Sequence, residues 1–263
     1  MTGTSNCTEV TPQCPVSATT YGYRPNLGGN CLLAAIFGLC TVYQLVAGIR
    51  SRQKLFAIAL TVGCVMELIG YTGRIKMHKN PWDSGGFETQ IICLILAPSF
   101  VAAGIYWSLK HIVMVLAPEK SLLRPDLYPW IFVGCDIGSI LLQAAGGGVA
   151  GAAKSNNPKL LNAGNNIMIA GIAFQVATMA ACGVLAAIFV VRLVREGRPE
   201  EVLAYVTVLI RCIYRLPEMA GGWGNPLMQN EKEFMILDGA MVAIAVITLT
   251  VLHPLYTCRF LRR

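Results

Sequence analysis

Two ionisable side chains lie in one apolar stretch of the sequence, where lipid would make them costly. Glu67 lies well inside an apolar run that begins near Leu55, and Arg74 ends that run seven residues later. Seven residues make two helical turns, so both side chains project from one face of one helix. A carboxylate at this depth costs about 2.5–3.5 kcal/mol on insertion scales, so it should face other helices, a partner charge or water. The pair is therefore either a polar clamp that fixes helix packing or part of a path for a substrate or a proton.

Other apolar runs carry polar side chains in the same manner. Asp136 and Gln143 are again seven residues apart and share one helical face. Gln175 is a single amide in the next run, a type of residue that more often joins helices than contacts a ligand. Asp238 lies near the start of the last apolar run. The pattern indicates polar groups that are set into a membrane bundle at several depths.

The sixth apolar stretch is short and carries the densest charge pattern. It runs for only thirteen residues, 202–214, which falls short of the bilayer core at about 1.5 Å per residue. Arg211, Arg215 and Glu218 follow at i, i+4 and i+7, so they line one helical face and could pair along it. Glu231 comes next, just before the last apolar run.

The composition indicates a polytopic membrane protein. The chain has 263 residues, of which 55% are hydrophobic and 13% charged, whereas soluble domains average about 25% charged residues. We expect an all-α fold in one domain, a helix bundle in lipid. The net charge of +7 does not indicate nucleic-acid binding, because Lys and Arg cluster in short loops where they set topology.

Seven transmembrane helices are expected, most of them longer than the roughly 20 residues that span the hydrocarbon core. Their expected ranges are 29–49, 54–75, 89–115, 129–153, 165–194, 202–216 and 233–254. The bundle 29–254 would follow an outer segment 1–28 and precede a cytoplasmic tail 255–263. With the N-terminus outside, the cytoplasmic loops carry more Lys and Arg than the outer segments, in line with the positive-inside rule.

The N-terminal segment has features of an extracellular or luminal location. Asn6 begins the only N-glycosylation sequon of the chain, Asn-Cys-Thr. A disulfide between Cys7 and Cys14 would be stable on that side of the membrane. The other eight cysteines lie in or beside apolar runs without metal-ligand spacing, so we expect them to be structural. The sequence gives no reason to expect a cofactor.

Proline and glycine mark two further positions in the apolar runs. Pro98 would kink the third helix, which leaves a hinge, a ligand notch or a plain packing irregularity as interpretations. The glycine run 146–148 with Gly151 is expected to let helices approach closely. A phosphate cradle would need Lys or Ser/Thr at set positions after the glycines, and that pattern is absent from the sequence.

An ordered set of motifs runs through residues 21–255. Its members are Glu67-x-x-Gly70-Tyr71-x-x-Arg74, Ala97-Pro98 with Ala102 and Tyr106, Asp136 with Gln143 and the glycine run, Gly171 with Gln175, Arg211-x-x-Tyr214-Arg215-x-x-Glu218 with Gly222, Glu231 with Asp238, and His253-Pro254. Each motif alone is weak, but the ordered set is specific. It resembles the fungal RTA-like lipid-translocating exporter family, seven-helix proteins named for resistance to an aminocholesterol.

The resemblance implies a multi-pass protein of the plasma membrane or an endomembrane that confers resistance to amphiphilic toxins. For some members it also implies export or flipping of sphingoid long-chain bases. This sequence departs from the family pattern in two places. Arg195 reaches Val202 within a few residues, where members typically carry a longer cytoplasmic loop and a full sixth helix. Pro217 stands directly before Glu218, where a helix would normally continue.

The first functional hypothesis is a transporter or flippase for amphiphilic lipids. A polar path between helices could hold the ammonium of a cationic long-chain base beside buried carboxylates while its chain stays in lipid. The residues proposed to line it are Glu67, Arg74, Asp136, Gln143, Gln175, Arg211, Arg215, Glu218, Glu231 and Asp238. No Walker A motif is present, so direct drive by ATP is not expected. The expected partners are membrane lipids and the substrate, and the oligomeric state is left open.

Two other classes of function are alternatives to transport. A seven-helix receptor or stress sensor fits the helix number and the basic tail, but the third helix ends at Trp107–His111 without an Asp-Arg switch. An intramembrane zinc hydrolase needs about three His or carboxylate ligands on one metal. The only histidines are 78, 111 and 253, and the expected topology places His78 opposite the other two. We therefore do not expect an enzyme.

Overall fold

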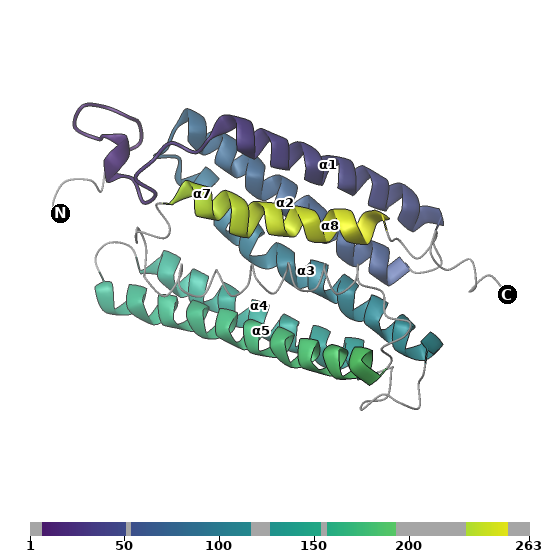
Figure 1. The fold of residues 1–263 in the computed structure, drawn as a ribbon. Coiled ribbons are helices and arrows are strands. Elements are labelled where there is room, and N and C mark those ends of the chain that lie inside the picture. The colour runs from purple at the N-terminus through teal and green to yellow at the C-terminus, as the bar shows by residue number, and fades with distance from the viewer. Residues whose placement is uncertain (1–6, 51–53, 117–126, 154–156, 193–229, 252–263) are drawn as a thin grey trace.

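Long apolar helices make up the part of the chain that the computed structural model describes, namely residues 7–50, 54–116, 127–153, 157–192 and 230–251. In chain order they are η1 (Val16–Ala18), α1 (Leu27–Arg50), α2 (Lys54–Lys79), α3 (Ser84–Leu116), α4 (Leu127–Ala152), α5 (Pro158–Arg192), α7 (Glu231–Glu233), the π-helix η3 (Phe234–Ala240) and α8 (Met241–Val251). α7, η3 and α8 follow one another without a break and form the last long helix (Figure 1).

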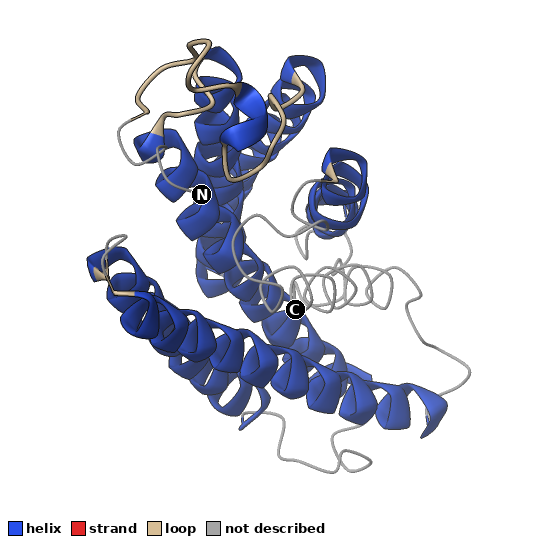
Figure 2. Cartoon of the chain, turned by 90° about the vertical axis from the view of Figure 1, so that its left-hand side faces the viewer, coloured by secondary structure: helices blue, strands red, loops and turns tan. Residues whose placement is uncertain are grey.

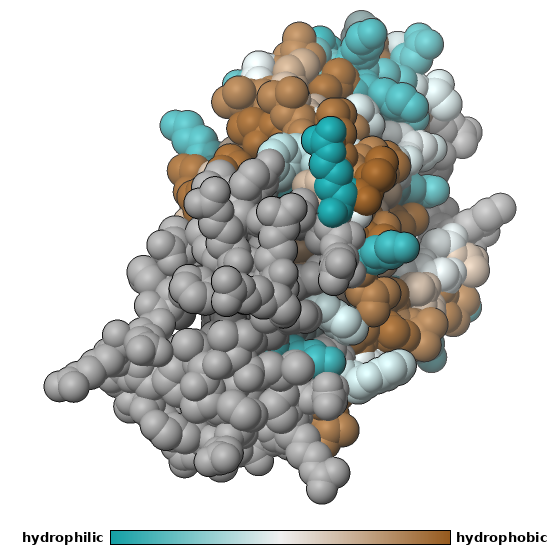
Figure 3. Space-filling model, turned by 90° about the vertical axis from the view of Figure 1, so that its right-hand side faces the viewer, coloured by the Kyte–Doolittle hydropathy of each residue, from teal (hydrophilic) through white to brown (hydrophobic). Residues whose placement is uncertain are grey.

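Within the described ranges, six helices are long and apolar enough to cross a membrane. The all-helical membrane fold expected from the composition is thus supported, whereas the expected sixth helix, 202–216, lies outside the described residues. The outer faces fit a hydrocarbon solvent. Leu39 of α1 is 73% exposed and Trp130 of α4 is 80% exposed, which is expected for side chains that face lipid rather than water. Figure 3 shows such apolar side chains over much of the coloured surface at one end of the bundle.

The helices form two packed groups that meet at α3. α1, α2, α3 and the last helix share the main core, in which Phe37, Leu60, Tyr106 and Val246 are fully buried. α4 and α5 form an antiparallel pair below this group (Figure 1). Seen from the side turned by 90°, this pair forms a separate layer (Figure 2), and it contacts the rest chiefly through α3.

Three helices extend four or more residues beyond the ends expected from the apolar runs. α2 continues to Lys79 rather than 75, α3 begins at Ser84 rather than 89, and α5 begins at Pro158 rather than 165. Polar capping residues explain the early starts. Asp83 and Asn157 stand just before α3 and α5, and each side chain accepts a hydrogen bond from a backbone amide of the first turn. α5 also begins with Pro158. Proline suits the first helical position because its fixed φ is helical and the amide N–H that it lacks would have no partner within the helix.

Candidate functional site: two polar networks

Arg74 is the centre of a polar network at the end of the bundle where α1 begins and α2 ends. Its side chain is completely buried, and each guanidinium nitrogen donates a hydrogen bond. The acceptors are Asn30 Oδ1 on α1 (3.0 Å from Nε), Gln90 Oε1 on α3 (3.2 Å from Nη1), and Tyr23 Oη (3.2 Å from Nη2). The same Nη2 lies 3.4 Å from Glu231 Oε1 on α7, as an ion pair. One side chain thus joins three helices, the last helix and the N-terminal segment.

Aromatic rings complete the surroundings of the Arg74 guanidinium. Its central carbon lies 4.1 Å from the centroid of the Phe234 ring and 5.5 Å from that of Tyr21. Ring faces attract a cation, and the attraction grows when both groups are removed from water. Because each guanidinium nitrogen is engaged and Glu231 pairs with the charge, the geometry supports a polar clamp for Arg74 rather than a ligand-binding role.

Two acidic side chains, Glu67 and Asp238, are also completely buried in the main helix group. Glu67 and Arg74 lie on the same inward face of α2, as their spacing predicted. Between them, Tyr71 stacks on Phe37 of α1 with ring centroids 5.7 Å apart.

The π-helix η3 brings its backbone close to α1 and α2 beside this face. A Cβ built on Gly239 would lie 2.8 Å from the hydroxyl of Tyr71 and 2.6 Å from Leu33, so a larger residue would force one of these side chains to shift. Asp238 is the preceding residue, and it therefore enters the bundle where the last helix has a widened turn. Widened turns of this kind are frequent at functional sites.

The second network joins α3, α4 and α5. Gln143 Nε2 donates to Gln175 Oε1 (3.0 Å), and Gln175 Nε2 donates to Ser99 Oγ (2.7 Å). Ser99 directly follows Pro98, so the amide chain contacts α3 beside its proline. Gly171 permits the close approach, because a Cβ there would lie 2.8 Å from the Gln143 side chain. Gln175 therefore joins three helices, which is the structural role that its isolated position suggested.

Asp136 lies on the same face of α4 as Gln143. It differs from Arg74 because, within the described ranges, its two carboxylate oxygens accept no hydrogen bond of good geometry. The residue is 3% exposed, and Ser139 Oγ donates to its backbone carbonyl (2.7 Å) rather than to its carboxylate. The hydroxyl of Tyr106 approaches the carboxylate. However, no group in the described ranges donates a hydrogen bond of acceptable geometry to either carboxylate oxygen, and none donates to Gln143 Oε1. Within the described ranges, this face of α4 therefore offers buried acceptors that receive no hydrogen bond of good geometry, although the Tyr106 hydroxyl lies beside Asp136.

Glycines set the contact between α4 and α5. A Cβ on Gly146 would lie 2.6 Å from a backbone nitrogen of α5, and one on Gly164 would lie 2.5 Å from a backbone nitrogen of α4. The packing role predicted for Gly146 is confirmed. It is wrong for Gly148 and Gly151 as far as the described residues go, since none of them lies within 4 Å of a Cβ at either position. Those two glycines lie on the exposed side of α4.

The structure therefore distributes the predicted path residues over more than one cluster. It joins Arg74 with Glu231, and Gln143 with Gln175, through direct contacts. Arg211, Arg215 and Glu218 lie outside the described residues, as does Asn6 of the sequon. Sequence reasoning missed Asn30, Gln90, Tyr23 and Ser99, although Asn30 and Gln90 are polar residues at the edges of apolar runs.

Potential metal ligands do not gather in the described part of the chain. No group of three or more His, Cys, Asp or Glu side chains there could hold a metal ion. His78 instead lies with its Nδ1 2.6 Å from the carbonyl oxygen of Pro25, where the N-terminal segment meets α2.

Comparisons with known proteins point to one family. The family model described as "RTA1 like protein" matches residues 60–260. The chain is 33% identical to a protein named sphingoid long-chain base transporter RSB1 from Saccharomyces cerevisiae, over 89% of this chain and 72% of that protein. It is 23% identical to the S. cerevisiae protein named RTA1, over 89% and 84% of the two chains. It is also 26% identical to the S. cerevisiae protoporphyrin uptake protein 1, over 74% and 67%.

No solved structure matches this chain. The alignment to the RSB1 transporter spans 279 positions, more than the 263 residues of this chain. That relative therefore contains residues within the aligned part for which this chain has gaps.

Proposed function

The chain belongs to the RTA1-like family, and on that premise we propose that it moves amphiphilic cationic lipids, such as sphingoid long-chain bases, across a membrane. The family relation and six membrane-length helices support lipid transport by a multi-pass protein. The proposal includes a seventh helix within 202–216, an N-terminus outside and a C-terminus in the cytoplasm. It places the protein in the plasma membrane or an endomembrane, without catalytic activity.

The buried carboxylate of Asp136 is the observation that carries the proposal. A carboxylate inside an apolar bundle is costly unless donors or an opposite charge compensate it. A primary ammonium supplies a positive charge and three donors, and it could make the charge-assisted hydrogen bonds that are strongest in such surroundings. Asp136 is therefore the residue we propose for binding the headgroup.

The neighbouring residues of α4 suit the rest of an amphiphilic molecule. Ile137 and Leu141 are more than half exposed on the side of α4 that faces lipid. An ammonium at Asp136 could thus lie inside the bundle while its hydrocarbon chain lies along α4 in the bilayer. Gln143 Oε1, two helical turns further along, offers a second acceptor for the amine or for a hydroxyl of the headgroup. We propose that these acceptors line the path of the headgroup.

Flux measurements in vesicles test the proposal. Purified protein in lipid vesicles should move a fluorescent long-chain base faster than protein-free vesicles do. Asp136→Asn keeps the shape of the side chain but removes its charge, and it should lower the protein-dependent rate at least tenfold, as expected for loss of a buried charged partner. Gln44→Leu is the matched control, because Gln44 is equally buried but lies on α1, where it donates to Thr250.

The control should keep most of the rate. An unchanged rate in Asp136→Asn would refute the headgroup site. If correctly folded wild-type protein moves no lipid at all, the transport proposal fails and a receptor or stress sensor becomes the better hypothesis.

A further inference from the structure

The segment before α1 is folded over the end of the bundle that contains the Arg74 network (Figure 1). Residues 7–26, here called the N-terminal lid, include a small loop closed by the Cys7–Cys14 disulfide. Thr11 and Cys14 exchange two backbone hydrogen bonds within this loop (3.3 and 2.9 Å). The loop is therefore a preformed hairpin rather than a free end of the chain.

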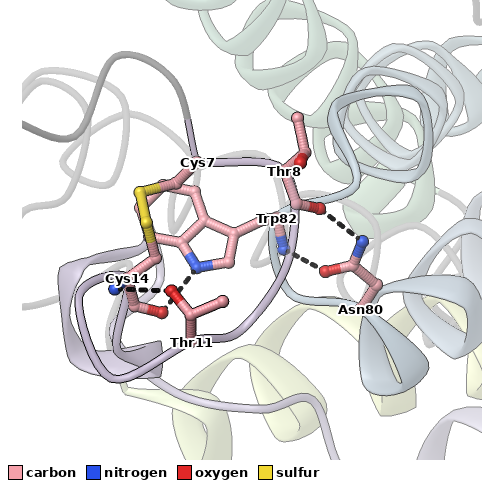
Figure 4. The surroundings of a disulfide bond; sticks show 6 residues. All are labelled: Cys7, Thr8, Thr11, Cys14, Asn80 and Trp82. Atoms are coloured by element: carbon pink, nitrogen blue, oxygen red, sulfur yellow. Dashed lines mark hydrogen bonds between the residues drawn. A yellow bond between two sulfur atoms is a disulfide. The ribbon is translucent and has the colours of Figure 1, made fainter.

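The hairpin is attached to the turn between α2 and α3 at two points (Figure 4). Asn80 Nδ2 donates to the carbonyl oxygen of Thr8 (2.8 Å), and Trp82 Nε1 donates to that of Cys14 (3.2 Å). The disulfide holds the two acceptor residues in one small ring, so both hydrogen bonds can form together. These attachments lie at the rim of the bundle, and the one from Asn80 is exposed to solvent.

The second half of the lid fills the space above α2 and α3. Tyr21 is 3% exposed and packs with Met77 of α2 and Phe87 of α3, its ring centroid 5.6 Å from that of Phe87. Its hydroxyl accepts a hydrogen bond from Gln90 Nε2. Gln90 also accepts from Arg74, so the lid is connected to the buried cation through one shared side chain.

The lid also reaches the last helix. The backbone nitrogen of Asn26 donates to Glu231 Oε1, the same oxygen that pairs with Arg74. Tyr23 accepts from Arg74 directly. The lid thus joins the ends of α2, α3 and α7 in one layer, and a molecule leaving between these helices would have to displace it.

From this arrangement we propose that residues 7–26 act as a lid over this end of the bundle, fastened at its rim by the disulfide hairpin on Asn80 and Trp82. The buried part of the lid is held by Tyr21, whereas the rim attachments are the part that can open to solvent first. The role of the lid in substrate exit rests on the proposed transport function. Its closure does not, and it can be measured separately.

Accessibility of Met77 reports whether the lid is closed. Met77 is 3% exposed beneath Tyr21, so Met77→Cys should react slowly with a maleimide in purified protein, with labelling at residue 77 read by peptide mass spectrometry. Adding Trp82→Ala, which removes one rim hydrogen bond, should raise this rate about fivefold to tenfold. Cys7→Ser with Cys14→Ser, which opens the ring that holds both acceptors, should raise it at least as much. Trp130→Ala on the exposed face of α4 is the matched control and should leave the rate unchanged.

Equal labelling rates in all variants, with thermal unfolding unchanged, would overturn the lid. If Trp82→Ala unfolds the protein, Asn80→Ala removes the other attachment with a smaller change in volume and gives the same test. Flux of the long-chain base is then compared in the same variants. A change in flux together with faster labelling supports a lid on the exit path. Faster labelling with unchanged flux keeps the lid but removes it from that path, and absence of wild-type flux refutes transport alone.

Discussion

Arg74 and Asp136 are both buried ionisable residues in apolar helices, yet their surroundings are opposite. All three nitrogens of the Arg74 guanidinium donate hydrogen bonds, and an ion pair and two aromatic rings lie around it. The carboxylate of Asp136 meets no donor with hydrogen-bond geometry in the described ranges. We therefore propose a different purpose for each of these two buried ionisable residues.

This contrast gives a criterion for separating structural polar groups from candidate ligand-binding groups in a membrane protein. A network whose members all have hydrogen-bond partners needs no ligand, and removing its central side chain leaves several buried polar groups without a partner. An unsaturated acceptor costs stability in the empty protein, and a ligand with donors can recover that cost. We expect substitutions at Arg74 to affect folding most and substitutions at Asp136 to affect the substrate most.

The largest effect is expected for Arg74→Ala. It leaves the buried acceptors Asn30 Oδ1 and Gln90 Oε1 without their common donor, and each buried polar group left unpaired typically costs about 1–3 kcal/mol of unfolding free energy. Thermal unfolding of the purified protein should show a clear loss of stability. Lys76→Ala, on the exposed side of the same helix, is the control. Equal stability of the two variants would break the comparison.

A smaller effect is expected at the α4–α5 contact. Gly164→Ala places a Cβ 2.5 Å from a backbone nitrogen of α4, and such overpacking typically costs about 1–3 kcal/mol. Gly148→Ala is the matched change on the open side of α4, where nothing lies within 4 Å. It should be neutral or stabilise by up to about 1 kcal/mol, because alanine favours helix over glycine. Equal unfolding temperatures for the two variants would show that the glycine contact does not hold the pair.

Gln175→Leu should have a still smaller effect on stability. It removes the amide that joins α3 to α4, and hydrogen bonds between membrane helices average about 0.6 kcal/mol, with a maximum near 1.7 kcal/mol. The variant also leaves Gln143 Nε2 without its acceptor, so flux can change through the position of Gln143. A double-mutant cycle with Ser99→Ala measures the coupling, and zero coupling would contradict the described network.

The smallest effect is expected for Glu231→Gln. Its ion pair with Arg74 is long, 3.4 Å, and the Glu231 side chain is 23% exposed, so solvent screens the interaction. Partly exposed pairs contribute about 0–1 kcal/mol. The amide oxygen introduced by Glu231→Gln can still accept hydrogen bonds from the Asn26 backbone and from Arg74. A loss of stability as large as that of Arg74→Ala would mean that the charge, rather than the network of hydrogen bonds, holds this end together.

The sequence predicted which residues of these networks are buried but not which partners they contact, and both outcomes have physical reasons. Spacing by seven residues correctly predicted that Glu67, Arg74, Asp136 and Gln143 are buried, because lipid penalises polar groups on the outer face. It could not predict which helices supply their partners, since contacts between helices depend on packing over long sequence separations. Arg74 and Glu231 are 157 residues apart, for example.

Local rules also explain the errors. The early start of α5 depends on Asn157 and Pro158, which lie outside the apolar run that predicted the helix. The glycines of α4 show the opposite error, because the sequence predicted more close contacts than the described residues make. The spacing of the small residues predicted a packing role for the whole run 146–148 with Gly151. A helix turns its residues to different sides, however, and of these glycines only Gly146 contacts α5 closely.

The most direct test of the account is the thermal stability of purified protein with and without a cationic long-chain base. Binding to the folded state should raise the unfolding free energy by about 2.7 kcal/mol at one hundred times Kd. We predict this stabilisation for the wild type and Gln44→Leu, its loss in Asp136→Asn, and none for an N-acylated, uncharged analogue. Equal stabilisation of Asp136→Asn and the wild type would contradict the claim that the unsaturated carboxylate binds the headgroup.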